Sequence, residues 1–145
     1  MFFATHSSYM IDKSNIERCY KVEKVGNSKT KISKITGPTK TYAEVNYEVF
    51  DVASSDYHNQ LYGKLQDNNL IYTEKETEDF LIKKGIKQTK DYIKVNKDGT
   101  LSPSSKITLH TYIRNLIHHP ENTNNKIFTE IELRDSIKTL IALTK

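Results

Sequence analysis

The sequence contains little cysteine, glycine and proline, and it contains no tryptophan. Cys19 is the only cysteine, which excludes an intrachain disulfide and a cysteine-based zinc site and suits a reducing cytosol. The five glycines are isolated from one another, so the chain has no GxxxxGK[ST] loop to hold nucleotide phosphates. We therefore expect that the chain does not hydrolyse ATP by itself.

Long hydrophobic runs are also missing. No apolar stretch approaches the roughly 20 residues that a membrane-spanning helix needs. The N-terminal residues lack the basic region and the apolar core of a signal peptide. We expect a cytoplasmic protein without membrane contact. Its 145 residues leave room for one ordinary domain, or for a small domain with an appendage.

The charge pattern gives only a weak indication of a partner. The formal net charge of +4 favours a polyanionic partner slightly. Lysines and glutamates are mixed along the chain, which predicts a solvated surface and no dedicated basic face.

The first part of the chain has β character. Alternating residues over 16–36, with Gly26 and Asn27 between the two halves, predict a β-hairpin. Gly37 and Pro38 interrupt the pattern and predict a domain boundary there. We expect a β segment over residues 1–38 and a separate helical bundle over residues 41–145.

Helical spacing dominates the second part. Apolar periodicity predicts helices over 42–53, 57–69 and 74–84, with a short strand or a linker at 92–95. Thr73 with Glu76, and Thr129 with Glu132, have the spacing of capping boxes, so a helix is expected to begin at each threonine. The predicted class is α+β, mainly α, with a bundle of four to five helices.

The most informative segment is the predicted helix that begins near Leu109. Its apolar residues follow helical spacing and predict one buried stripe; they are Leu109, Tyr112, Ile113, Leu116 and Ile117. His110, Arg114 and His118 lie four apart on a polar row, and Asn115 and His119 form a second row. Pro120 disfavours helical geometry at His119, so the helix should end there.

Arg114, Asn115 and His119 match the RNxxxH pattern of HEPN domains. HEPN domains are small helical domains, many of them metal-independent ribonucleases of bacterial defence and toxin systems, and this segment resembles them closely. The residues 118–122 also resemble helical tails behind defence-associated ATPases. An arginine and a histidine on a polar helix face are also a common surface pair, stabilised by the helix dipole, and that alternative stays open.

The resemblance implies a catalytic set of Arg114, Asn115, His118 and His119. Metal-free RNA cleavage needs an acid–base pair and a cation for the phosphate. His119 would serve as acid or base and Arg114 as the cation, with Asn115 orienting His119. His118 would be either the second catalytic histidine or a structural residue. In the family, two motifs usually meet across a homodimer. No metal site is expected, and His58 is interpreted as an ordinary, partly buried helix residue.

A second resemblance concerns the N-terminus. Thr5, His6 and Ser7 follow a short apolar run, as in the switch loop of ABC-type and OLD-type ATPases. The resemblance implies that His6 contacts the γ-phosphate of ATP, provided that an ATPase body completes the site. Residues 1–38 would then be the end of an ATPase core.

These interpretations predict a metal-independent and cofactor-free RNA endonuclease of toxin or anti-phage defence type. RNA is the expected substrate, with tRNA as one target class, and an ATPase subunit or domain is the expected partner. The alternative is a non-catalytic helical module that binds a partner or dimerises the ATPase. A third and weaker option is a plain nucleic-acid-binding domain.

Overall fold

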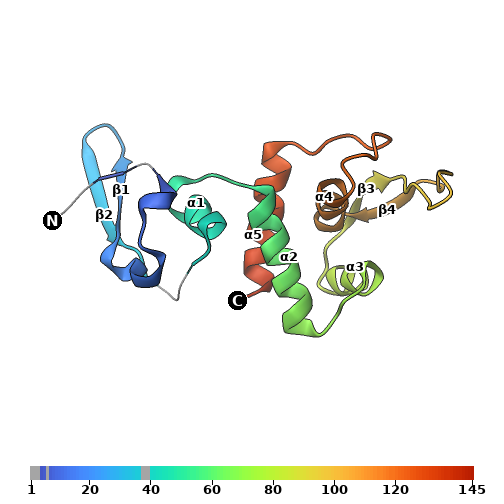
Figure 1. The fold of residues 1–145 in the computed structure, drawn as a ribbon, viewed down its shortest axis with the longest axis horizontal. Helices are drawn as coiled ribbons and strands as arrows, with labels where there is room; N and C mark the ends of the chain where they lie inside the picture. Colours follow the sequence, from blue (N-terminus) through green and yellow to red (C-terminus); the bar gives the residue numbers. More distant parts are fainter. Residues whose placement is uncertain (1–3, 6, 37–39) are drawn as a thin grey trace. The chain divides into compact units, whose positions relative to one another are not determined.

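The computed structural model describes residues 4–5, 7–36 and 40–145 (Figure 1). The chain divides into two compact units, Met1–Val52 and Ala53–Lys145. The described elements are helices with two small antiparallel sheets, so the predicted α+β, mainly α class is confirmed. Among the described residues, no helix is both long and apolar enough to span a membrane.

The first unit contains the expected hairpin. Strands β1 (Tyr20–Val25) and β2 (Lys29–Lys34) pair antiparallel, with Val22 opposite Ile32. Gly26 has a φ of 66°, a left-handed conformation that glycine adopts without a steric penalty and that suits the turn between the strands. Two short 3₁₀ helices, η1 (Ser8–Met10) and η2 (Lys13–Arg18), precede the hairpin. The apolar segment 1–3 and His6 lie outside the described residues.

Helix α1 (Tyr42–Phe50) belongs to this first unit. Val45 is fully buried and packs with Ile16 and Ile35 in one small core. The division between the units therefore falls between Val52 and Ala53, after the first helix and not before it as expected. The physical reason is that the hairpin segment has too few apolar residues to form a core without this helix.

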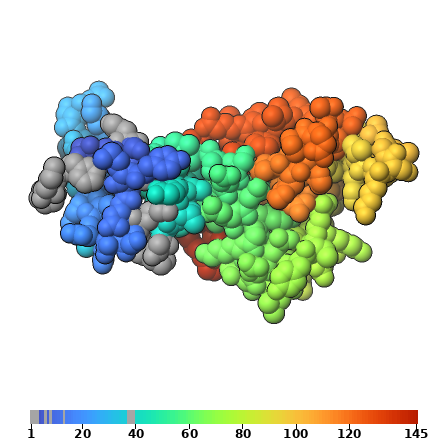
Figure 2. All heavy atoms as spheres, viewed as in Figure 1, coloured from blue at the N-terminus to red at the C-terminus, as the bar shows by residue number. Residues whose placement is uncertain are grey.

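The second unit begins with two capped helices. Ser54 caps α2 (Ser55–Asn69), and Thr73 with Glu76 forms the predicted capping box of α3 (Glu74–Lys83). A two-stranded sheet follows, formed by β3 (Gln88–Tyr92) and β4 (Ser105–Thr108). The strand expected at 92–95 thus lies earlier in the chain. The connection between the strands projects at the edge of this unit (yellow in Figure 2).

The last two helices are α4 (Leu109–His118) and α5 (Glu130–Leu143). Helices α2 and α5 lie side by side and run in the same direction (Figure 1). Helix α4 contacts both of them but crosses α5, so the expected antiparallel pairing of α4 and α5 is wrong. Because β4 leads directly into α4, the direction of α4 follows from the packing of the small sheet.

A buried carboxylate connects α3 to the start of α4. Glu78 is 9% exposed, and its Oε1 accepts the backbone N–H of Thr108 at 2.7 Å and the Nε2 of Gln88 at 3.0 Å. Its Oε2 accepts the hydroxyls of Thr108 at 2.9 Å and of Thr111 at 2.6 Å. Four donors from three elements therefore converge on one side chain.

Removing this carboxylate should destabilise the second unit strongly. Glu78→Ala leaves buried donors of Thr108 and Thr111 without an acceptor, so the free energy of unfolding should fall by about 3–5 kcal/mol. Urea unfolding followed by circular dichroism measures this change. The matched control is Asp79→Ala, an exposed carboxylate on the same helix, which should change the stability by less than about 0.5 kcal/mol. Equal effects of the two substitutions would contradict the assigned role of Glu78.

Candidate functional site

The candidate site lies at the C-terminal end of α4. The helix ends at His118, and His119 has a non-helical φ of −129° and ψ of 61°. The backbone N–H of His119 still donates to the carbonyl of Asn115 at 2.9 Å. The helix end predicted from Pro120 is therefore confirmed. The last turn of the helix carries His118, Arg114 lies one turn before it, and His119 follows the helix.

Arg114 lies at the edge of the protein surface. Its Nη1 donates to Oδ1 of Asn115 at 3.0 Å and lies 3.7 Å from Oε2 of Glu74 on α3. The two side chains of this ion pair are 30% and 44% exposed, so solvent screening leaves it weak, at about 0–1 kcal/mol. An anion with better geometry can therefore compete with Glu74 for the guanidinium group.

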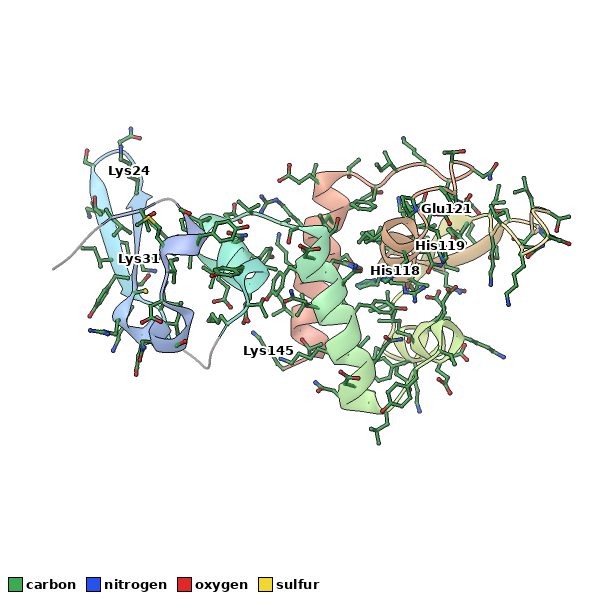
Figure 3. The ribbon with its side chains drawn as sticks, viewed as in Figure 1. Lys24, Lys31, His118, His119, Glu121 and Lys145 are labelled. Atoms are coloured by element: carbon green, nitrogen blue, oxygen red, sulfur yellow. The ribbon has the colours of Figure 1, made fainter. Side chains whose placement is uncertain are left out.

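His118 and His119 are both exposed and lie near Glu121 (Figure 3). Nδ1 of His119 lies 3.2 Å from Oε1 of Glu121, and this pair is open to solvent. The pKa of His118 is lowered by partial burial and then by the nearby positive charges of Arg114 and His119. The three side chains therefore lie close enough to act on one another electrostatically, and this environment favours the neutral form of His118.

Asn115 does not take the place expected for it. Its side chain is 1% exposed, and it contacts Arg114 through a hydrogen bond instead of orienting His119. Asn115 follows Tyr112 by one helical turn, and Tyr112 and Ile113 are buried, so the residue lies on the covered face of α4. The expected orienting role of Asn115 toward His119 stays a prediction, and in this structure the amide of Asn115 holds Arg114.

The loop after His119 is fixed through two asparagines that the sequence analysis did not single out. Asn122 and Asn125 both donate to the carbonyl of Ile93, at 2.9 Å and 2.8 Å. Asn125 also accepts the N–H of Ile93 at 2.8 Å. This clamp joins the segment behind His119 to the strand segment after β3. The asparagine-rich composition of the loop was its only signal in the sequence.

Tyr92 is a further residue of the site that sequence reasoning missed. It is 5% exposed, and its ring packs edge-on against Tyr112 with centroids 6.1 Å apart. Burial raises its pKa, and the charges of Glu74, Arg114 and Glu121 also act on its hydroxyl. Tyr92 is therefore a buried neighbour of Arg114, Glu74 and Glu121.

The nucleotide-contacting role of His6 stays a prediction, because His6 lies outside the described residues. Of its neighbours, the backbone N–H of Ser7 donates to Oγ1 of Thr5 at 2.9 Å. No cluster of three or more histidine, cysteine or carboxylate side chains suited to a metal ion occurs in residues 4–5, 7–36 and 40–145.

The two remaining histidines are buried, contrary to expectation. His58 is 0% exposed and not partly buried, and its Nε2 lies 2.9 Å from the hydroxyl of Ser136 on α5. His110 is 4% exposed and does not lie on a polar face with Arg114. Neither ring nitrogen of His110 has a hydrogen-bond partner among the described residues. The small sheet and α2 cover α4 near its start. His110, the first residue of the polar row that the sequence predicts, is therefore buried.

These buried histidines should make the protein sensitive to acid. Burial, then the charge of His110, lowers the pKa of His58 to about 3, and burial lowers the pKa of His110 to about 4. Both are neutral in the folded protein, whereas the unfolded chain binds protons below a pKa of about 6.5. The free energy of unfolding should therefore fall as the pH falls from about 6.5 to 4, by up to about 1.4 kcal/mol per pH unit for each histidine.

Urea unfolding at a series of pH values measures this dependence. The paired substitution His58→Gln and His110→Gln should flatten it, whereas His119→Ala, at an exposed histidine, should leave it as in the unsubstituted protein. The same pH dependence in all three proteins would show that the buried pair is not its source.

Comparison of the chain with protein-family models, with curated proteins and with solved structures found no match.

Proposed function

We propose that this chain is a metal-independent RNA endonuclease of toxin or anti-phage defence type. The observation that carries the proposal is the group of side chains at the end of α4, where the partly exposed Arg114 lies near the exposed His118 and His119. The spacing of Arg114, Asn115 and His119 resembles the HEPN motif, and HEPN domains use such a group on RNA. Glu74 contacts Arg114, and Glu121 contacts His119. Both carboxylates are exposed and weakly held, so a phosphate can replace them.

The proposed reaction uses the 2′-hydroxyl of the RNA as its nucleophile. His119 removes the 2′-hydroxyl proton, the 2′-oxygen bonds to phosphorus, and the bond from phosphorus to the 5′-oxygen breaks. A second histidine, His118 or His119 of another copy, gives a proton to the leaving 5′-oxygen. Arg114 binds two phosphate oxygens and stabilises the charge that develops there. The buried Asn115 holds the guanidinium group in place.

A homodimer would supply the second set of catalytic groups. In this arrangement two α4 ends face one shared cleft, and each contributes an arginine and a histidine. Cleavage activity per chain should then fall on dilution, as the dimer dissociates. An ATPase subunit or domain is the proposed regulatory partner of this nuclease, by resemblance to defence systems.

Cleavage of labelled single-stranded RNA and of tRNA tests the proposal. His119→Ala should lower the cleavage rate by at least about 100-fold, since it removes the acid–base group. Arg114→Lys should also abolish cleavage, because lysine keeps the charge but loses the planar, two-pronged donor. A chelator such as EDTA should have no effect on the rate.

Lys138→Ala is the matched control, since Lys138 is an exposed cation on α5 outside the site. It should leave the cleavage rate unchanged. His119→Ala should leave the stability within about 0.5 kcal/mol of the original value, because the residue is exposed. Intact RNA at all concentrations of the original protein would contradict the proposal.

The second candidate function is a non-catalytic module for dimerisation or partner binding. One observation favours it: Asn115 is buried, and Arg114 already contacts both Asn115 and Glu74. Substitutions at Arg114 and His119 would then alter binding of a second copy or of an ATPase, and RNA would stay intact.

A further inference from the structure

We infer that the β1–β2 hairpin binds the backbone and bases of single-stranded RNA. This inference rests on the proposed function in one respect, namely that RNA is the substrate of the chain. It concerns a different surface, in the first unit, within the segment that by resemblance would be the end of an ATPase core.

The first observation is the concentration of positive charge on the hairpin. Residues 20–34 contain five lysines and one acidic residue, Glu23. The hairpin therefore has a formal net charge of +4, equal to that of the whole chain, and the remaining residues sum to zero. The expectation of evenly mixed charge is wrong for this segment. The lysines are Lys21, Lys24, Lys29, Lys31 and Lys34.

The second observation is that the two faces of the hairpin differ. Opposed residues of an antiparallel pair lie on the same face. Tyr20 opposes Lys34, Val22 opposes Ile32 and Lys24 opposes Thr30, so these six residues share one face. The side chains of Tyr20, Val22 and Ile32 are 55%, 65% and 66% exposed. This face therefore presents an aromatic ring and two aliphatic side chains between two lysines, Lys24 and Lys34, while the other three lysines of the hairpin lie on the opposite face.

The opposite face is the one that packs on the first unit. Lys21 and Ser33 are half-buried there and line a hollow together with Glu48 of α1, and Lys34 reaches the same hollow from the end of the exposed face. Glu23 also lies on this face and forms an ion pair with Lys21 at 2.8 Å. The only acidic residue of the hairpin is thus on the packed face and is already paired. The exposed face combines lysines with apolar side chains and includes no acidic residue.

This combination fits a single strand of nucleic acid. Lysines neutralise phosphates, and aromatic side chains stack on bases whatever their sequence. In a duplex the base faces are stacked on one another and cannot reach Tyr20, Val22 or Ile32. Charge complementarity together with the exposed ring therefore favours single-stranded RNA over a duplex.

The binding experiment uses the full chain carrying His119→Ala, so that bound RNA is not cut. Fluorescence anisotropy with a labelled single-stranded RNA gives the affinity at several salt concentrations. The double substitution Lys24→Glu and Lys34→Glu should weaken binding at least about tenfold and should lower the slope of log affinity against log salt by about 1.4. Tyr20→Ala should weaken binding about fivefold or more and leave that slope unchanged, because it removes stacking and no charge.

The matched control is Lys64→Glu with Lys138→Glu, which makes the same change in net charge at exposed positions of the second unit. This control should keep the affinity within about twofold. Equal weakening by both charge reversals, or equal affinity for a duplex of the same sequence, would overturn the inference. Hairpin-dependent binding to phosphatidylserine vesicles without binding to RNA would overturn it as well.

The cleavage assay separates this inference from the proposed function. Hairpin-dependent RNA binding without any cleavage by the original protein would support the inference and contradict the nuclease. RNA cleavage whose KM is unchanged by Lys24→Glu and Lys34→Glu would support the nuclease and overturn the role of the hairpin.

Discussion

The second unit depends on the buried carboxylate of Glu78. A carboxylate only accepts hydrogen bonds, and every group that contacts this one is a donor. A buried carboxylate is tolerated only when donors surround it, so the groups that donate to Glu78 cannot move far from their positions. Glu78 thereby fixes the junction between β4 and α4 relative to α3. The direction of α4 decides where Arg114 and His119 reach the surface, so the candidate site depends on the contact that Glu78 of α3 makes with the opposite end of α4.

Features set by neighbouring residues could be predicted from the sequence. The capping boxes at Thr73 and Thr129 and the helix end before Pro120 are such features, because each arises within a few residues of chain. Strand β3 could not be placed, since its residues have weak strand character and are defined by pairing with β4. The crossing of α4 over α5 was missed for a similar reason. It follows from the contact of α4 with the small sheet, which is remote in sequence.

The candidate site shows the same division. Arg114 and His119 could be identified from their spacing, and the helix presents both near the surface. Their neighbours Glu74, Tyr92 and Asn122 come from other segments, so the RNxxxH motif does not predict that they lie at the site. The burial of His110 and Asn115 could not be predicted, because a helical row is polar or interior only according to what covers it. The sequence likewise does not show which lysines of the β1–β2 hairpin share a face with its exposed apolar side chains, because this depends on the register of the two strands.

The asparagine clamp on Ile93 has a consequence for how the sequence can vary. At position 93, Asn122 and Asn125 contact the main-chain N–H and carbonyl through hydrogen bonds, in the manner of a paired peptide strand. The hydrogen bonds themselves place no demand on the side chain at 93, so many residue types can occupy it while the segment beside His119 keeps its path. Proline is the exception, because it has no N–H to donate. Residue 93 can therefore vary in sequence without loss of these hydrogen bonds. Asn122 and Asn125 cannot vary in the same way, because each forms its hydrogen bonds through its side-chain amide.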